Sequence, residues 1–242
     1  MQMRYIGSLL LILSSLFLST TVSLAQTVPD GTYIYAPERS TGGIGRFYMG
    51  REISGVMGYQ AAQWLERPER IQEEMPDEMV ANLKLRPTDV VGDIGAGSGY
   101  YAFRMAELVP QGKVLAVDIQ PQMLELIETR KSSEGVSNVE GILGDIDDTH
   151  LPADQVDLVL LVDAYHEFSH PWEMMSSIVE GLKSGGRIVL LEYRAEDASI
   201  PIRPLHKMTQ DQVKREMAVF DMEFIETLDF LPWQHMMFFA KK

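Results

Sequence analysis

The period with which apolar residues recur changes along the chain. Residues 51–85 have a helical period, with Met57, Ala61, Trp64 and Leu65 on one face. Further along, short continuous apolar runs alternate with segments of helical period. The expected strands are residues 89–94, 114–118, 139–143, 156–164 and 187–192, and the expected helices between them are residues 100–108, 120–130 and 171–182. Strands that alternate with helices predict a doubly wound α/β fold built on a parallel sheet.

The C-terminal segment has a different pattern. Thr209 followed by Gln212 is a capping box, which predicts a helix that ends near Ala218. Two strand-like runs follow, residues 223–230 and 234–240, with no helix between them, so they are expected to pair as an antiparallel hairpin. The predicted fold is a doubly wound, mostly parallel seven-stranded sheet with a C-terminal antiparallel hairpin and a helical N-terminal extension.

The N-terminal residues predict an export signal. Arg4 is the only charged residue before Asp30, an apolar run covers residues 6–18, and Ser23 and Ala25 are small residues suited to a cleavage site. Cleavage near Ala25 would place the protein in the periplasm or outside the cell. The alternative is an uncleaved anchor, because the charge-free segment is nearly long enough to span a bilayer.

The expected domain organisation follows from these patterns. A signal peptide covers residues 1–25, an irregular and then helical extension covers residues 26–76, and the α/β domain covers residues 77–242. The first part of the extension, residues 26–50, is rich in Gly, Pro and Tyr and is expected to be irregular.

Composition excludes several classes of function. The formal net charge of −14 argues against nucleic-acid binding and against binding to an anionic membrane surface, so no membrane contact is expected beyond the export signal. The chain has no cysteine, which excludes disulfides, thiolate nucleophiles and cysteine-based metal sites.

A glycine-rich loop is the sharpest chemical feature. Gly95, Gly97 and Gly99 lie between an expected strand and an expected helix, and Asp118 ends the next strand. Glycines allow a tight turn and a close approach of ligand to backbone, and an acid at that place can bind ribose hydroxyls. The G-x-G-x-G spacing differs from the G-x-G-x-x-G of dinucleotide enzymes. The loop therefore predicts a nucleoside ligand, with Asp93 close enough to meet a cationic end of it.

Residues 93–99 resemble the first motif of class I S-adenosylmethionine-dependent methyltransferases, and residues 182–187 resemble a later turn of that family, with Ser184 in place of the usual proline. The resemblance covers residues 77–242 and, together with the export signal, is to the exported bacterial type. It implies S-adenosylmethionine as cofactor, with Asp118 on the ribose and Asp145 at the adenine. The implied cofactor-binding residues are Asp93, Gly95, Ala96, Gly97, Gly99, Asp118, Ile119, Asp145, Ile146 and Asp163.

Two of these assignments have simpler alternatives. Asp145 lies in an acidic stretch and could be a turn residue. Met123 stands where the family places a residue that packs on adenine, but it also has the spacing of a core residue. Trp64 is expected in the core, because it shares the apolar face of its predicted helix.

The expected catalytic residues follow the most apolar strand. In an open α/β sheet, ligands bind at the carboxyl ends of the strands, which places Tyr165, His166 and Glu167 at the site. His166 could act as a general base, Tyr165 could face the reacting sulfonium, and Glu167 could orient His166. The alternative is that His166 caps the next helix and Glu167 faces solvent.

His166 and His170 also fit the H-E-x-x-H pattern of zinc proteases. That chemistry needs both histidines on one face of a helix, whereas here the pattern follows a strand and Pro171 takes His170 out of helical geometry. No metal site is predicted, and a looser divalent-metal site that uses His166 or Glu167 stays open as an alternative.

The acceptor is expected to be a small molecule. Basic and aromatic residues in segments 45–70 and 192–208, His206 among them, could bind it. Three alternatives stay open: a non-catalytic module that binds or senses S-adenosylmethionine, an NAD-dependent oxidoreductase, and a zinc hydrolase.

Overall fold

The computed structural model describes residue 29 and residues 32–242 of the chain. The export signal expected over residues 1–25 lies outside the described residues. Within the described part, no helix has the length and apolar character needed to cross a bilayer.

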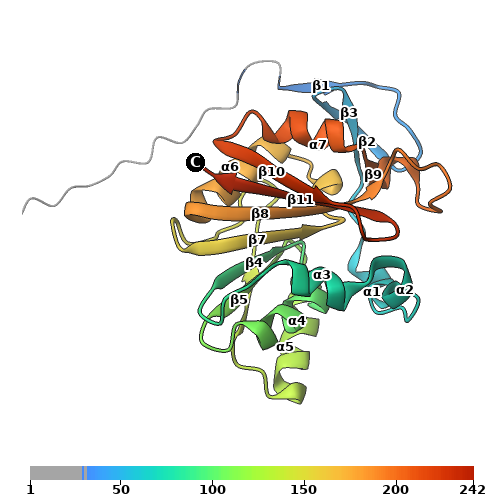
Figure 1. The fold of residues 1–242 in the computed structure, drawn as a ribbon. Helices are drawn as coiled ribbons and strands as arrows, with labels where there is room; N and C mark the ends of the chain where they lie inside the picture. Colours follow the sequence, from blue (N-terminus) through green and yellow to red (C-terminus); the bar gives the residue numbers. More distant parts are fainter. Residues whose placement is uncertain (1–28, 30–31) are drawn as a thin grey trace, which may run out of the picture.

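The central sheet has the strand order β10-β11-β8-β7-β4-β5-β6, and a two-residue strand, β9, pairs with β8 outside this path (Figure 1). Strands β4 to β8 are parallel to one another, whereas β11 is antiparallel to both β8 and β10. The predicted mostly parallel seven-stranded sheet with its antiparallel hairpin is therefore confirmed. The strands are Val90–Ile94 (β4), Lys113–Asp118 (β5), Val139–Leu143 (β6), Val156–Val162 (β7), Leu182–Arg194 (β8), Lys207–Met208 (β9), Met222–Leu228 (β10) and Gln234–Lys241 (β11).

Helices cover both faces of this sheet because its strands are apolar on both sides. In β8, Val189 and Leu191 face one core, and Ile188 and Leu190 face the other. The helices are Pro76–Asn82 (α3), Tyr100–Leu108 (α4), Pro121–Glu134 (α5), Pro171–Gly181 (α6) and Gln210–Met217 (α7). Side chains of α3 and α4 pack in the first core, and those of α6 and α7 pack in the second.

The direction of winding reverses at β4. The chain passes from β4 to β5 on one side of the sheet and returns to β7 on the other side of β4. The loops that follow these strands diverge there, which leaves a crevice at the carboxyl ends where α/β proteins bind ligands.

The N-terminal extension differs from the prediction. Residues expected to be irregular or helical form a small antiparallel sheet of Tyr33–Tyr35 (β1), Gly43–Tyr48 (β2) and Arg51–Ser54 (β3). Only short helices follow: a 3₁₀ turn at Tyr59–Ala61, then Ala62–Leu65 (α1) and Arg70–Glu74 (α2). The turn at Met49-Gly50 closes a hairpin, so residues 51–54 are a strand and not part of a helix. Short helices do cover much of residues 59–82, as the helical period predicted.

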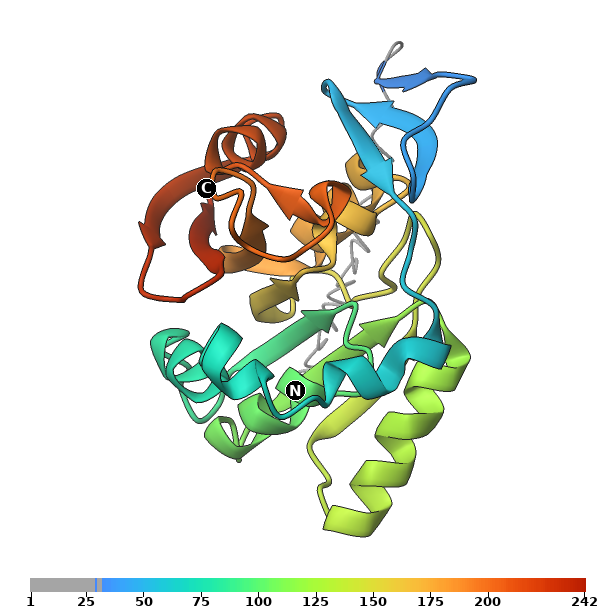
Figure 2. The same ribbon diagram turned by 90° about the vertical axis from the view of Figure 1, so that its right-hand side faces the viewer.

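The extension lies over the carboxyl ends of the parallel strands. Figure 2 shows the segment after β3 descending from the small sheet to α1, on the side of the molecule that these strand ends face. Trp64, which was expected in the core, is 42% exposed, and the guanidinium of Arg67 lies 3.5 Å from the centroid of its ring.

The capping box at α7 is formed as expected. Thr209 Oγ1 accepts a hydrogen bond from the backbone N–H of Gln212 at 3.1 Å, and the helix runs from Gln210 to Met217. This helix carries Glu216, which is fully buried and reaches the functional site from the second core.

Candidate functional site

A cavity of about 470 Å³ lies at the carboxyl ends of β4, β5, β7 and β8. One end is formed by the glycine loop and Asp118, the other by His166, Glu167 and His206. Residues of the extension, Met57 among them, and residues 201–203 form the remaining walls. The volume is in the range of small-molecule and cofactor sites.

The glycine loop turns tightly at the end of β4. Gly95 and Gly97 have φ values of +73° and +54°, a backbone conformation that residues with a side chain rarely adopt. A Cβ atom on Gly97 would lie 2.6 Å from Leu65 Cδ1, and one on Gly95 would lie 2.8 Å from the Cβ of Ala164. The sequence therefore needs glycine at both places, and both line the cavity.

Asp118 is fixed in place at the end of β5. Its Oδ2 accepts from the N–H of Gly97 and its Oδ1 from the N–H of Gln120, each at 2.9 Å. Burial raises the pKa of Asp118, and these two hydrogen bonds act in the opposite direction. Asp118 lines the cavity, and its contact with ribose stays a prediction.

Of the other predicted cofactor-binding residues, some line the cavity and some do not. Ile119, Asp145, Ile146 and Asp163 line the cavity together with Asp118, Gly95 and Gly97. Asp93, Ala96 and Gly99 are not among its lining residues. Met123 is compatible with both a core position and a contact with adenine, because it is buried in the protein and also lines the cavity.

Two charged side chains gather beyond the glycine loop. Asp163 is partly buried, and its Oδ2 accepts from Gln234 Nε2 at 2.6 Å. Burial, reinforced by the charges of Glu74 and Glu192, raises the pKa of Asp163 well above its ordinary value. Arg70 also lines the cavity and is held by Glu74, with 2.6 Å between Arg70 Nε and Glu74 Oε2.

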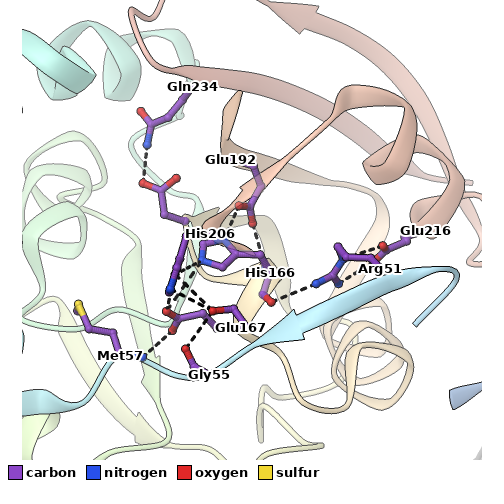
Figure 3. Close-up of polar contacts among 11 residues, drawn as sticks. Arg51, Gly55, Met57, His166, Glu167, Glu192, His206, Glu216 and Gln234 are labelled. Carbon is purple, nitrogen blue, oxygen red and sulfur yellow. Dashed lines mark hydrogen bonds and ion pairs between the residues drawn. The ribbon is translucent and has the colours of Figure 1, made fainter. Parts of the chain in front are cut away.

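His166, Glu167 and His206 converge at the opposite end of the cavity (Figure 3). His166 Nε2 lies 3.0 Å from His206 Nδ1, His206 Nδ1 lies 3.4 Å from Glu167 Oε1, and His166 Nε2 lies 3.9 Å from Glu167 Oε1. The two histidines come from segments 40 residues apart in the sequence. We call these three residues the His-Glu-His cluster.

A second carboxyl group holds His166 from behind. Glu192, at the carboxyl end of β8, lies with Oε2 2.5 Å from His166 Nδ1, and its Oε1 accepts from the backbone N–H of His166 at 3.1 Å. Burial lowers the pKa of His166 to about 3, and burial raises the pKa of Glu192 to about 8. Both shifts favour uncharged forms, so His166 is neutral and its Nε2 is directed at the cavity side of the cluster.

The extension is tied across the top of the cavity. Met57 N–H donates to Glu167 Oε2 at 3.1 Å, and Met57 O accepts from Gln120 Nε2 at 3.0 Å. Gln120 Oε1 in turn accepts from the N–H of Tyr59 at 2.8 Å. One short segment therefore contacts residues at both ends of the cavity.

A buried ion pair fixes the base of the extension. Arg51 in β3 contacts both carboxylate oxygens of Glu216, at 2.9 and 3.0 Å, and donates through Nη1 to the carbonyl of His166 at 3.1 Å. Figure 3 shows this guanidinium between α7 and the His166 backbone. Arg51 thereby couples the small sheet to the segment that carries the cluster.

The structure places Tyr165 and His170 away from the cavity. Tyr165 is fully buried, with Phe168 against one side and the guanidinium of Arg51 5.6 Å from its ring centroid. Its role is to support the 3₁₀ turn at Tyr165–Glu167 from below. His170 bonds to its neighbour Ser169 at 2.9 Å and does not join the cluster, so H-E-x-x-H is not the arrangement that groups the histidines.

Sequence patterns did not reveal Glu192 or Arg70 as site residues, nor the pairing of His166 with His206. One signal for Glu192 was present: it ends an apolar strand expected beside residues 156–164, and carboxyl ends of parallel strands share one edge. Arg70 had no such signal, because its position depends on the path of the extension.

A Rossmann-like sheet with an antiparallel end, a glycine loop and an acid at the end of the next strand define the class I S-adenosylmethionine-dependent methyltransferases. A family model described as a methyltransferase domain matches residues 85–235. The chain belongs to this family, whose methyl donor is S-adenosylmethionine.

Curated relatives match a shorter part of the chain. A ubiquinone/menaquinone biosynthesis C-methyltransferase of Ectopseudomonas mendocina is 31% identical over 111 residues, 45% of this chain and 43% of that protein. A protein-L-isoaspartate O-methyltransferase of Ignicoccus hospitalis is 33% identical over 113 residues, 46% of this chain and 51% of that protein. The matches thus span about half the length of these relatives.

Solved structures confirm the fold. An S-adenosylmethionine-dependent methyltransferase from Aquifex aeolicus aligns with a TM-score of 0.73 at 19% identity, and the alignment covers 77% of this chain and 100% of that one. A geranyl diphosphate methyltransferase aligns with a TM-score of 0.57 at 14% identity, covering 77% of this chain and 92% of that one.

Proposed function

We propose that the protein transfers the methyl group of S-adenosylmethionine to a small-molecule acceptor that must lose a proton, such as a hydroxyl compound or a carbon acid. The observation that carries this proposal is a single cavity with the glycine loop and Asp118 at one end and the His-Glu-His cluster at the other. The proposed donor and acceptor sites thus open into the same cavity.

The cofactor would occupy the glycine-loop end. Asp118 would accept hydrogen bonds from the ribose hydroxyls, and Asp145 with Ile146 would border the adenine. At the amino-acid end of the cofactor, Arg70 suits the carboxylate, because opposite charges pair well. The carboxyl group of Asp163 would accept a hydrogen bond from the ammonium group. Asp93 is then a buried support of the loop.

The acceptor would occupy the cluster end. Glu167 and His206 line the cavity with His166, and all three offer proton-accepting atoms on the cavity side. A group that surrenders a proton there becomes a stronger nucleophile. The roof formed by Met57 and its hydrogen bonds favours an acceptor small enough to be enclosed.

The reaction itself is an in-line displacement at a sulfonium. The acceptor atom forms a bond to the methyl carbon as the carbon–sulfur bond breaks, and the positive charge on sulfur is lost. The enzyme contributes mainly alignment of the two reactants and removal of the acceptor proton. Enclosure also protects the activated acceptor from water.

Calorimetric titration with S-adenosylmethionine, and separately with NAD, tests the cofactor assignment. We expect binding of S-adenosylmethionine alone. Asp118→Ala should weaken it by about 1.5–3 kcal/mol, or roughly 10- to 150-fold, since charge-assisted hydrogen bonds are lost. Asp147→Ala, an acid of the neighbouring turn outside the cavity lining, is the matched control and should leave the affinity unchanged. Unchanged affinity in Asp118→Ala would refute the assignment.

Release of S-adenosylhomocysteine in the presence of a panel of phenols, catechols and 1,3-dicarbonyl compounds tests transfer. Turnover with any member supports the proposal. Binding of S-adenosylmethionine with no turnover across the panel would favour the non-catalytic sensing module instead, and binding of NAD would favour the oxidoreductase.

We also propose that residues 1–25 direct export and are removed near Ala25. The support is the sequence alone: one positive charge, an apolar run and small residues at the cleavage position. Cell fractionation with intact-mass measurement tests this. A protein recovered in the cytosol with its N-terminus intact would contradict it.

A further inference from the structure

The His-Glu-His cluster brings three possible metal-ligand atoms together, and its hydrogen bonds can be traced from the outside inward. Ser54 Oγ lies 3.2 Å from the carbonyl of Gly55 and 3.1 Å from His206 Nε2. A hydroxyl that donates to Gly55 accepts from His206. A neutral His206 with its proton on Nε2 directs a bare lone pair at Nδ1 into the cluster.

The same tracing applies to His166. Glu192 receives the backbone N–H of His166 and lies 2.5 Å from His166 Nδ1. His166 Nε2 faces His206 Nδ1 at 3.0 Å, and it can bind a metal ion when Nδ1 carries the ring proton towards Glu192. Glu167 Oε1 is the third atom that faces this point. A proton shared between the histidines or a metal ion between the three atoms would each satisfy the cluster.

The spacing of these atoms fits a metal ion. Bonds of about 2.1 Å at a tetrahedral centre put two ligand atoms about 3.4 Å apart. The three separations in the cluster are 3.0, 3.4 and 3.9 Å. All three atoms are already close to the corners of such a coordination shell, on side chains that are 2%, 16% and 23% exposed.

The surroundings resemble those of catalytic metal sites. A metal-bound histidine usually donates its other ring N–H to a carboxylate or another acceptor, which fixes its orientation. His166 has Glu192 in that position, and His206 has Ser54. Glu167 is held in the same way, since its second oxygen accepts from the N–H of Met57. Each of the three residues therefore has a supporting partner on the side away from the cluster.

We propose that His166 Nε2, His206 Nδ1 and Glu167 Oε1 bind a divalent first-row transition-metal ion, such as Zn²⁺ or Mn²⁺, with its open coordination positions facing the cavity. Two imidazoles and one carboxylate form a set that suits these ions better than Mg²⁺ or Ca²⁺. An acceptor oxygen bound at an open position would lose its proton more easily. That use of the ion rests on the proposed methyl transfer, whereas binding of the ion does not.

Calorimetric titration of untagged, chelator-treated protein with Zn²⁺, Mn²⁺ and Mg²⁺ tests the proposal. We expect one equivalent of Zn²⁺ at micromolar affinity or tighter, weaker Mn²⁺, and no comparable Mg²⁺ binding. His206→Ala should reduce Zn²⁺ affinity at least about 100-fold, and Glu192→Gln about 10- to 100-fold, because the first loses a ligand and the second a supporting partner.

His170→Ala is the matched control, since His170 follows the same segment but lies outside the cluster. It should bind Zn²⁺ as the unaltered protein does. Loss of binding in His170→Ala with retention in His206→Ala would overturn the proposal and favour the zinc-hydrolase geometry. Absence of stoichiometric Zn²⁺ binding would also overturn it and assign a proton to the centre of the cluster.

S-adenosylmethionine affinity, measured in parallel, shows that each variant is folded and separates this proposal from the proposed function. Normal cofactor binding without Zn²⁺ binding refutes the metal site and leaves methyl transfer standing. If His206→Ala does not fold, the visible spectrum of the Co²⁺-loaded unaltered protein provides the second measurement. Intense bands typical of low-coordinate Co²⁺ support the site, and the spectrum of the hexaaqua ion refutes it.

Discussion

The two ends of the cavity are built in different ways. The cofactor end is assembled from neighbouring segments: the glycine loop follows β4, and Asp118 ends the adjacent strand and binds the loop through Gly97. The cluster end brings together His166, Glu192 and His206 from three separate segments, closed by a residue of the extension. Local motifs thus determine the glycine loop and its acid, whereas long-range packing determines the cluster end and the position of Arg70.

This difference predicts how each end responds to change. The glycine loop lies between two paired strands of the central sheet and should tolerate disturbance elsewhere. The cluster depends on contacts with β3, β8 and the loop before β9, so it should be sensitive to changes outside the cavity. Variants that separate methyl transfer or stability from cofactor affinity test this expectation.

The largest expected effect is on turnover. His166→Ala should lower kcat about 10²- to 10⁴-fold, the usual contribution of a group that assists proton removal, whether it acts directly or as a metal ligand. Affinity for S-adenosylmethionine should stay within about twofold, because the cofactor end is built independently. Steady-state kinetics with a panel acceptor, together with calorimetry, provides both values.

His170→Ala is the control for that experiment and should keep full turnover. If His166→Ala binds the cofactor and also turns over normally, His166 has no part in the chemistry. If it loses cofactor affinity in proportion to turnover, the two ends are not independent.

The next effect is on stability. Arg51→Ala leaves Glu216 buried without its ion-pair partner and removes a hydrogen bond to the carbonyl of His166. Loss of one partner of a buried pair costs about 3–5 kcal/mol. We expect the free energy of unfolding, measured by urea titration, to fall by that amount.

Lys113→Ala provides the comparison, because its pair with Glu140 is exposed at both side chains. An exposed pair contributes less than about 1 kcal/mol. Equal effects of the two substitutions would mean that the extension does not depend on Arg51, and the sensitivity assigned to the cluster end would be wrong.

Sequence patterns predicted the central domain well because the signals that define it are local in the sequence. Runs such as residues 156–164 and 187–192 are apolar on both faces, and only a sheet covered by helices on both sides can bury them. The glycine loop was recognisable because its conformation needs glycine at fixed spacing. Both signals lie within a few consecutive residues.

The extension and the cluster could not be predicted in this way. The hairpin of β2 and β3 carries Arg51, which is held by Glu216, 165 residues further along the chain. Trp64 has the spacing of a core residue, but its helix borders the cavity, where the guanidinium of Arg67 covers the ring and the side chain stays partly exposed. The contacts of Glu192 and His206 with His166 can be predicted only when the strand order is known.

The pH dependence of stability tests the buried state of Asp93, which supports the glycine loop. Burial raises its pKa from an ordinary value near 4 to about 7, so the folded protein holds a proton that the unfolded chain releases between these values. This carboxyl group therefore lowers the free energy of unfolding as the pH rises from about 4 to about 7. Asp93→Asn cannot release that proton, and it should gain a few kcal/mol relative to the unaltered protein across this range.

Urea titrations at a series of pH values measure this difference. Asp157→Asn is a control of opposite sign: Lys183 and Arg86 outweigh burial and lower the pKa of Asp157, so its contribution is lost as the pH falls. A difference between Asp93→Asn and the unaltered protein that does not vary with pH would show that Asp93 is ionised throughout.

The smallest expected effect concerns the N-terminal cap of α7, the helix that carries Glu216. Thr209→Ala removes the side-chain cap of α7 and should cost about 1 kcal/mol in unfolding free energy, whereas Thr209→Ser should cost little. The cap is a local sequence motif, but it is connected to the cluster end, because α7 carries Glu216 and Glu216 pairs with Arg51.

If Thr209→Ala lowers turnover or Zn²⁺ affinity beyond its effect on unfolding, local and long-range elements are coupled through α7. If only stability changes, the cluster tolerates a weakened helix, and its sensitivity is confined to direct contacts such as that of Arg51 with the carbonyl of His166.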